Sequence, residues 1–229
     1  MPERKVLLIT GASSGIGAAT AHRAVEEGYD VALAARSKEK LSNLVDALGK
    51  THALAITCDV TDQQDQRRMV AETLERFGRI DALFANAGMG GTSGGFSGAN
   101  PDVWQSMILT NVYGVALSIQ AALPALREQR GHVLLTGSAA GRTTIPGSMY
   151  SATKWAVGGI GYNLREELRG SGMRVTLIEP GRVDTPFFDE PPKDAMKDID
   201  IANAVIYALQ QPAHVDVNEM LIRPTPPIE

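Results

Sequence analysis

Short apolar runs rich in β-branched residues alternate along the chain with longer segments whose apolar positions recur at helical spacing. The short runs predict strands at residues 5–10, 31–35, 53–57, 80–84, 132–136, 174–178 and 219–222. The longer segments predict helices at residues 15–27, 38–48, 63–77, 101–129, 148–169 and 199–209. Strands that alternate with helices are joined by right-handed crossovers, which produce a parallel sheet covered on both faces. The pattern therefore predicts a doubly wound α/β domain with a parallel sheet of about seven strands.

Nothing along the chain divides this pattern into two domains. The 229 residues contain no repeat and no linker rich in Pro or Ser, and two domains would each be small. Two irregular stretches, 88–100 with six glycines and 182–197 with three prolines, each follow a predicted strand. In a doubly wound sheet they would lie over the carboxyl edge, where such folds bind ligands, although simple mobile connections would look the same. We expect one Rossmann-type domain, 1–229, with its site at that edge.

Composition and charge narrow the classes of function. The chain has 22 Lys+Arg against 26 Asp+Glu, a net charge of -4 and no basic tract, which argues against nucleic acid as the main partner. Its one cysteine, Cys58, cannot form an internal disulfide, and its four histidines lack the spacing of a metal site. The first apolar run, 6–9, is too short for a signal peptide or a membrane span. These features favour a soluble cytoplasmic protein without a metal or a membrane partner.

A glycine-rich turn follows the first predicted strand and opens the first predicted helix. It reads Thr10-Gly11-Ala12-Ser13-Ser14-Gly15-Ile16-Gly17, a G-x-x-x-G-x-G pattern rather than the commoner G-x-G-x-x-G. Glycine permits the tight turn and lets backbone N–H groups approach a pyrophosphate, whose charge the helix N-terminus favours. The turn predicts a dinucleotide site, and the alternative is a tight connection that binds nothing.

The end of the second predicted strand bears on the choice of nucleotide. An NAD site has an acidic residue there, about 20 residues after the glycines, which binds the ribose hydroxyls. Here the position holds Ala35 followed by Arg36, while Asp30 precedes the strand at the opposite edge. A guanidinium pairs with a ribose 2′-phosphate, so this strand end favours NADP(H) over NAD(H). The alternative is that Arg36 is a solvated surface residue.

Three polar residues at a strand end and a helix start point to chemistry. Tyr150 and Lys154 project from one face of a predicted helix, and Ser138 follows the strand 132–136. Hydride transfer to a carbonyl carbon leaves an alkoxide that must be protonated. A nearby ammonium lowers the pKa of a tyrosine from about 10 toward neutrality, and a serine hydroxyl can hold the carbonyl oxygen. The three residues predict interconversion of an alcohol and a carbonyl compound.

With these motifs in this order, the sequence resembles the short-chain dehydrogenase/reductase family over nearly its whole length. Further matches are Asp59-Val60, Asn86-Ala87-Gly88, and Pro180-Gly181 followed by Val183 and Thr185. The resemblance implies that the catalytic residues are Asn111, Ser138, Tyr150 and Lys154. It implies cofactor contacts at Gly11, Ser13, Ser14, Gly15, Ile16, Gly17, Arg36, Asp59, Val60, Asn86, Ala87, Gly88, Tyr150, Lys154, Pro180, Gly181, Val183 and Thr185.

The resemblance also implies particular roles. Lys154 would bind the nicotinamide ribose, Asn111 would hold a water in a proton relay, and Thr185 would contact the carboxamide. By residue type alone, an asparagine in a helical segment would ordinarily point to solvent. One departure is Ala85, which stands where the family often has an asparagine. That change would loosen the bonding of the fourth strand without affecting the chemistry.

These features favour an NADP-dependent oxidoreductase that acts on a small-molecule secondary alcohol or carbonyl compound. The alternatives are an NAD-dependent alcohol dehydrogenase of the same family and a dinucleotide-sensing protein without turnover, which would be expected to lack the tyrosine or the lysine. The apolar residues Ile145, Met89, Met149, Phe187 and Phe188 are candidates for a substrate pocket or for the core. A short acidic segment with Asp184, Asp189 and Glu190 suits a small polar carbonyl compound.

Three glycines lie within four positions of the helix that carries Tyr150. Gly158, Gly159 and Gly161 each cost roughly 1 kcal/mol against alanine in a helix, so another backbone is expected to approach closely. That neighbour is either the sheet or a second subunit. The resemblance implies the second, with this helix packing across a two-fold axis in a homodimer or homotetramer.

Overall fold

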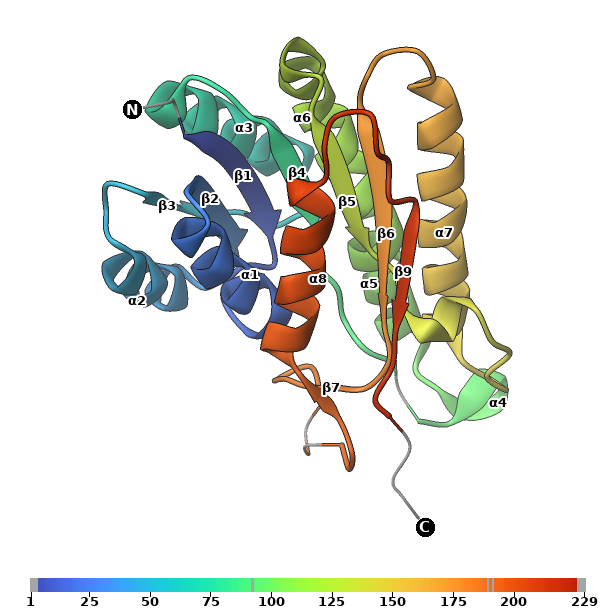
Figure 1. Cartoon of the computed structure of the whole chain (residues 1–229). Helices are drawn as coiled ribbons and strands as arrows, with labels where there is room; N and C mark the ends of the chain where they lie inside the picture. The colour runs from blue at the N-terminus through green and yellow to red at the C-terminus, as the bar shows by residue number, and fades with distance from the viewer. Residues whose placement is uncertain (1–3, 92, 189, 191, 226–229) are drawn as a thin grey trace.

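The computed structural model describes residues 4–91, 93–188, 190 and 192–225. Within this part of the chain, seven strands form one sheet in the order β3-β2-β1-β4-β5-β6-β9 (Figure 1). Every neighbouring pair is parallel. The strands are β1 Lys5–Thr10, β2 Tyr29–Ala35, β3 Ala53–Thr57, β4 Ala82–Ala85, β5 His132–Thr136, β6 Arg174–Pro180 and β9 Glu219–Ile222. The predicted fold class is confirmed.

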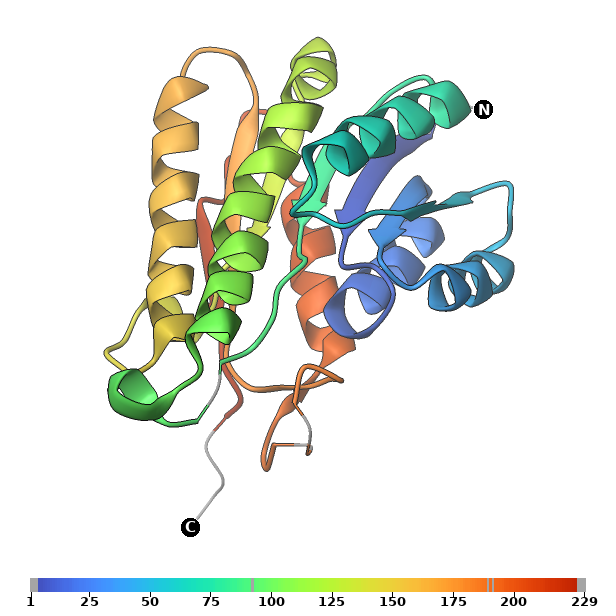
Figure 2. The same ribbon diagram turned by 180° about the vertical axis from the view of Figure 1, so that it is seen from behind.

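Helices cover both faces of the sheet (Figures 1 and 2). The helices on one face are α1 Gly15–Glu26, α2 Lys38–Leu48 and α8 Asp198–Gln210. The helices on the other face are α3 Gln63–Phe77, α6 Gly114–Gln129 and α7 Met149–Glu167. The buried residues of each group form one of two hydrophobic cores with the strand residues that point toward them.

Alternate residues of a central strand enter the two cores. On β1, Leu7 and Ile9 pack toward α1, α2 and α8, whereas Leu8 packs toward α3, α6 and α7. All three are fully buried, and each contributes roughly 1.5–3 kcal/mol by leaving water. A strand buried on both faces has no polar positions to alternate with, which is why the strands are nearly continuous apolar runs in the sequence.

The structure departs from the expected elements in several places. β2 begins at Tyr29, so Asp30 lies inside the strand, where its carboxylate accepts a 2.8 Å hydrogen bond from Arg4 Nε. The helix expected at 101–129 consists of α5 Pro101–Ile108, a π-helical turn η1 Leu109–Tyr113, and α6. Four short elements were not expected, because such pieces have no periodic pattern: α4 Gly95–Gly98, η2 Ala139–Gly141, β7 Val183–Asp184 and β8 Met196–Lys197.

The segment from α5 to α6 is also the one helical stretch of the described residues long and apolar enough to cross a membrane by length and composition. It packs on the sheet through buried residues such as Val115, Ile119 and Ala122. Core helices of globular proteins meet the same criterion. This core packing accounts for the buried part of the stretch, which is 44% of its most apolar window.

The chain changes direction between two neighbouring strands of the sheet. β1 lies between β2 and β4, so the connections that follow β1 and β4 leave toward opposite sides. In open α/β sheets, a ligand site forms at the carboxyl edge where this happens. The described parts of both irregular stretches lie at this edge, in the lower part of Figure 1.

Candidate active site

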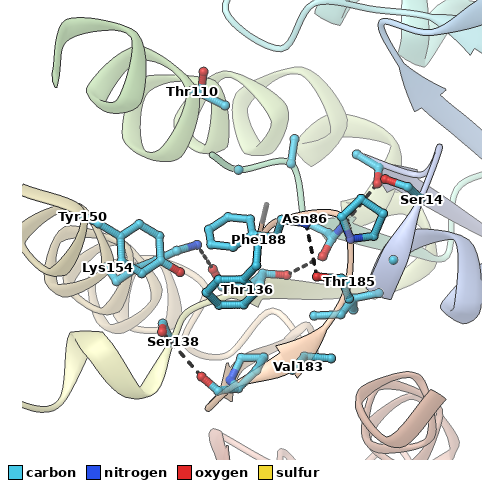
Figure 3. Close-up of a pocket in the computed structure, with 18 of the residues that line it drawn as sticks. Ser14, Asn86, Thr110, Thr136, Ser138, Tyr150, Lys154, Val183, Thr185 and Phe188 are labelled. Atoms are coloured by element: carbon cyan, nitrogen blue, oxygen red, sulfur yellow. Dashed lines mark hydrogen bonds between the residues drawn. The ribbon is translucent and has the colours of Figure 1, made fainter. Parts of the chain in front are cut away.

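A pocket of about 1270 Å³ opens at the carboxyl edge of the sheet. It runs from Arg36 after β2, past Ser138 after β5, to Arg223 after β9, and Figure 3 shows its central part. A typical small-molecule site has a volume of roughly 300–1,000 Å³. The pocket is therefore large enough for a dinucleotide and a second small molecule together.

The glycine turn forms one wall of this pocket. Gly11 and Gly15 have φ values of 65° and 53°, in the left-handed region that favours glycine. A Cβ at Gly15 would lie 3.1 Å from the Thr185 side chain, and one at Gly17 would lie 2.4 Å from the Gly11 carbonyl oxygen. Ser14, the N-cap of α1, makes no capping side-chain bond within the described residues. The first N–H groups of α1 are thus available to a phosphate, and the wall fits the pyrophosphate of a dinucleotide.

Asn86 joins the carboxyl ends of three strands. Its Nδ2 donates to the carbonyl oxygens of Thr10 at 3.2 Å and Gly11 at 3.3 Å, and its Oδ1 accepts from Thr136 Oγ1 at 3.0 Å (Figure 3). The preceding residue, Ala85, is buried in the core and pairs with Leu135 of β5. The expected loosening at Ala85 is not seen, because the strand pairing is kept and Asn86 supplies the cross-links.

Ser138, Tyr150 and Lys154 come together in the centre of the pocket (Figure 3). Ser148 caps α7 by accepting from Ser151 N at 3.1 Å, which places Tyr150 in the first turn and Lys154 one turn later. Lys154 Nζ donates to the carbonyl oxygen of Thr136 at 2.7 Å and lies 5.7 Å from the centre of the Tyr150 ring. Ser138 Oγ accepts from Ala140 N at 3.1 Å.

Burial controls the protonation of the tyrosine and the lysine. It raises the pKa of the Tyr150 phenol, and a hydrogen bond with Ser138 lowers that pKa by less. It lowers the pKa of the Lys154 ammonium to about 8. The expected lowering of the tyrosine pKa by the lysine is therefore not the dominant effect, since the lysine is itself desolvated and bonds to Thr136. At neutral pH the site holds a protonated phenol beside a positive charge.

Asn111 is buried behind the pocket and does not line it. Its Oδ1 accepts from Met89 N at 2.8 Å, and its Nδ2 donates to Met89 O at 3.0 Å and to Thr153 Oγ1 at 3.1 Å. It lies in the π-helical turn η1, a distortion often found at functional sites. A Cβ on Gly88 would lie 3.3 Å from Asn111 Oδ1 and 3.7 Å from Lys154 Nζ. Asn111 thus fixes the backbone beside the lysine instead of pointing to solvent.

The end of the pocket beside β2 carries two basic residues. Arg36 and Lys40 both line it, and so does Asp59. The pKa of Asp59 is lowered, first by a hydrogen bond from the Thr61 backbone N–H and less by the charge of Arg36. Lys40 was missed in the sequence, although its place four residues after Arg36 at a helix start could have indicated it.

The segment after β6 covers Tyr150 with aromatic rings. The Phe187 ring centre lies 5.7 Å from that of Tyr150, and the Phe188 ring centre lies 5.3 Å from that of Phe187. Ile145 also lines the pocket, whereas Met89 and Met149 do not. Among the acids that suggested a small polar substrate, Asp184 and Glu190 are exposed and lie outside the pocket wall, and Asp189 lies outside the described residues. The acidic character of the segment does not extend into the pocket.

Most of the residues singled out in the sequence line this pocket. Among those implied to contact the cofactor, Gly17 does not line it, because it packs on Gly11 inside the turn. Among the four implied to be catalytic, Asn111 does not. The members that line it are Gly11, Ser13, Ser14, Gly15, Ile16, Arg36, Asp59, Val60, Asn86, Ala87, Gly88, Ser138, Tyr150, Lys154, Pro180, Gly181, Val183 and Thr185.

Known proteins are similar to this chain over most of its length. The family model described as short chain dehydrogenase matches residues 5–195. An uncharacterized oxidoreductase of Staphylococcus aureus (strain MW2) is 39% identical over 225 residues, which is 96% of this chain and 97% of the relative.

Two solved structures are similar in fold and in sequence. An alcohol dehydrogenase from the archaeon Thermococcus sibiricus, complexed with 5-hydroxy-NADP, has a TM-score of 0.91 at 32% identity and covers 99% of this chain and 100% of its own. A 3-ketoacyl-(acyl-carrier-protein) reductase from Brucella melitensis, complexed with NADH, has a TM-score of 0.90 at 28% identity. It covers 96% of this chain and 97% of its own.

Proposed function

The chain belongs to the short-chain dehydrogenase family, and on that premise we propose that it is an NADP-dependent oxidoreductase that interconverts a secondary alcohol and a carbonyl compound. The observation that carries the proposal is the convergence of Tyr150, Ser138 and Lys154 beside the glycine turn. A bound nicotinamide would supply or accept the hydride at the substrate carbon.

The three side chains divide the work at the substrate oxygen. Tyr150 is protonated at neutral pH, so its hydroxyl gives a proton to the oxygen during reduction. In oxidation the phenolate form of Tyr150 takes the proton from the alcohol. Ser138 donates a hydrogen bond that holds the same oxygen. Lys154 keeps its ammonium below about pH 8, and this charge stabilises the phenolate that forms when Tyr150 gives up its proton. Asn111 keeps the backbone beside this lysine in place. We also propose that Asn111 holds a water molecule in a proton relay.

The preference for NADP(H) rests on the end of β2. Ala35 offers no acceptor for ribose hydroxyls, and Arg36 with Lys40 places two cations at this end of the pocket. Similar proteins bind either nucleotide, since one of the two structures above holds an NADP analogue and the other NADH. We also infer a cytoplasmic location, because the buried Cys58 is a free thiol.

Replacement of the tyrosine tests the catalytic part of the proposal. Tyr150→Phe should lower kcat by at least the ~10²-fold typical of a lost acid/base while NADPH still binds, as measured by nicotinamide fluorescence. Tyr162→Phe is the matched control, since Tyr162 is exposed on the same helix and away from the pocket. Turnover of the Tyr150 variant at the wild-type rate would remove this residue from the mechanism.

Titration with NADPH and NADH tests the cofactor part. A charge-assisted hydrogen bond is worth roughly 1.5–3 kcal/mol, so NADPH should bind about ten- to a hundredfold more tightly than NADH, with the lower end favoured because Arg36 is exposed. The double variant Ala35→Asp, Arg36→Gln should reverse the preference. Equal affinities in the wild type would show that Arg36 is a solvated surface residue.

A further inference from the structure

Two arginines at the other end of the pocket have no side-chain partner within the residues the structure describes. Arg182 follows the Pro180-Gly181 step after β6, and Arg223 directly follows β9. Both line the pocket. Arg142, which follows β5 and η2, is by contrast bonded to Glu179. A guanidinium carries five N–H donors, so two guanidinium groups in a pocket wall offer several unused donors to an anion.

The order of the strands places these arginines away from the end of the pocket that carries Arg36. Four strands, β1, β4, β5 and β6, separate β2, which ends before Arg36, from β9, which ends before Arg223. Ser138 follows β5 and therefore lies between them, two strands from β9, or about 10 Å at the usual strand spacing. The arginines thus lie on the side of Ser138 opposite to Arg36. Arg182 stands between Gly181 and Val183, which the resemblance assigns to the cofactor, so the experiment must separate the two roles.

Arg223 is held against the loop that follows β6. Ile222 pairs with Pro180, and Gly181 N donates to the Ile222 carbonyl oxygen at 2.7 Å. A Cβ on Gly181 would lie 3.3 Å from Arg223 Cγ. A side chain at position 181 would therefore crowd Arg223, which gives Gly181 a structural reason to lack one.

The charges along the pocket wall are unevenly distributed. The charged residues that line it are Arg36, Lys40, Asp59, Lys154, Arg182 and Arg223. Asp59, the acid among them, lies beside Arg36. The end with Arg182 and Arg223 therefore has two positive charges and no lining acid among the described residues. The chain as a whole has a net charge of -4. A concave positive wall on an acidic protein attracts anions selectively, and the guanidinium fork matches carboxylate and phosphate oxygens.

The wall next to the reacting oxygen is apolar. Phe187 packs on Tyr150, and Ile145 and Phe188 also line the pocket. A molecule that reaches from Tyr150 to the arginines therefore passes apolar side chains first and cations last. This sequence of contacts suits a short hydrocarbon stem with an anionic end.

We propose that Arg182 and Arg223 form an anion subsite and that the substrate is a secondary alcohol or ketone with a carboxylate or phosphate a few carbons from the reacting oxygen. The inference rests on the proposed function, since it takes Tyr150 and Ser138 as the reacting end. The sequence predicted a small polar carbonyl substrate, whereas the subsite predicts an anionic one.

Matched substrate pairs test the subsite. 3-Hydroxybutanoate, 4-hydroxypentanoate and 3-hydroxybutyl phosphate are compared with 3-hydroxybutanamide and 4-hydroxypentanamide at saturating NADP+. In the wild type, kcat/KM should be at least tenfold higher for the better acid than for its amide, or for the phosphate than for both amides. Arg182→Met and Arg223→Met should each reduce this ratio about tenfold or more, mainly through KM for the anion. Arg223→Lys should keep part of the ratio that Arg223→Met loses. The anion that gives the higher kcat/KM, carboxylate or phosphate, identifies the group that the subsite binds.

Binding is measured separately by calorimetric titration of the enzyme–NADP+ complex with each acid and with the phosphate. Arg169→Met is the control, because Arg169 is exposed beyond the end of α7, away from the pocket, and its loss should change neither the ratio nor the binding. Loss of NADPH affinity in Arg182→Met and Arg223→Met equal to that in Arg36→Gln would assign these arginines to the cofactor and overturn the subsite.

The two proposals fail in different ways. Equal turnover of acids and amides with a Tyr150-dependent rate would overturn the subsite and leave the oxidoreductase function standing. Turnover of nothing in the panel would count against the proposed function, and calorimetry alone would then decide the subsite. If neither the acids nor the phosphate bind to the enzyme–NADP+ complex, the anion subsite is overturned.

Discussion

Two buried basic side chains, Lys154 and His132, have their pKa values lowered by the same physical effect. Desolvation disfavours the protonated form of each, and it lowers the pKa of Lys154 to about 8 and that of His132 to about 3. Lys154 is in the pocket, where its remaining charge at neutral pH acts on Tyr150. His132 is in β5, where its Nε2 bonds to Thr176 Oγ1 at 2.7 Å. The first shift bears on the proposed catalysis, and the second bears on stability.

Lys154→Met removes the ammonium that lies 5.7 Å from the Tyr150 ring, so the phenolate of the proposed mechanism loses a nearby positive charge. The rate of alcohol oxidation rises as Tyr150 loses its proton, so the rising limb of the pH–rate profile should move upward by about one pH unit or more. NADPH affinity should also fall. Measurement of kcat from pH 6 to 10 in wild type and variant checks this, and an unchanged limb would contradict the coupling.

His132 should make the protein sensitive to acid. Its folded-state pKa of about 3 lies below its unfolded value of 6.5, so between these pH values the unfolded chain binds one more proton. The free energy of unfolding should therefore fall by about 1.4 kcal/mol per pH unit as pH decreases through this window, through this group alone.

The check is urea denaturation at pH 7 and pH 5. His132→Gln should lose about 2 kcal/mol less than the wild type between the two pH values. His214→Gln, which removes an exposed histidine, should behave as the wild type does. A His132→Gln variant as acid-sensitive as the wild type would show that the buried histidine is not the cause.

At the scale of elements, one buried ion pair joins three segments around the site. Arg142, at the end of η2, donates from Nε and Nη2 to the Glu179 carboxylate of β6 at 2.7–2.9 Å and also bonds to Glu219 of β9. Glu179 is 3% exposed, and a Cβ at Gly137 would lie 2.8 Å from its Cγ. The pair therefore lies directly under the strand end that carries Ser138.

Arg142→Met leaves the buried Glu179 carboxylate without its cation. Removal of one partner of a fully buried pair costs about 3–5 kcal/mol. Because Arg142 is partly exposed, the free energy of unfolding should drop by less, about 2–3 kcal/mol in urea denaturation. The double variant Arg142→Met, Glu179→Gln removes the buried charge as well and should recover part of the loss. If the double variant is as unstable as the single one, the loss comes from altered packing and not from the unpaired charge.

At the scale of the whole molecule, one outer surface is more apolar than a free surface needs to be. Large exposed apolar residues of α5, η1 and α7 contribute to it, namely Ile108, Leu109, Tyr113, Trp155 and Tyr162. Gly161 packs on Leu177 of β6, so the sheet is the close neighbour of this glycine. A Cβ on Gly158 or Gly159 would meet nothing within 4 Å, so the sheet does not explain these two. The proposed homodimer or homotetramer would explain these two glycines as sites of close helix approach.

Light scattering at micromolar concentration should give a mass of two or four times 24.4 kDa. Gly158→Glu adds a side chain where the single chain has space and should reduce the mass toward the monomer without loss of helicity. Ser42→Glu, at an exposed position of α2 on the opposite face of the sheet, is the control for added charge. A wild-type mass near 24.4 kDa would overturn the proposed assembly.

The sequence by itself determined the order of the elements and indicated that Ser138, Tyr150 and Lys154 would lie together, as they do in the pocket. Strand runs buried on both faces and helices with one apolar side produce periodic patterns within about ten residues, so they can be read locally. The glycine turn and the Tyr150–Lys154 spacing are local in the same sense. Even where bounds shifted, as at the start of β2, the type of element was correct.

Only the tertiary structure decided what depends on contacts between distant residues. Asn86 bonds to Thr10 76 positions away, Arg142 pairs with Glu179 37 positions away, and Asn111 is buried by its bonds to Met89 and Thr153. The acids Asp184 and Glu190 after β6 lie outside the pocket, whereas Arg182 and Arg223 line it. The sequence did not indicate which of these charged residues would face the pocket. Strand order and side-chain direction set these partners, and neither is encoded in the spacing of nearby residues.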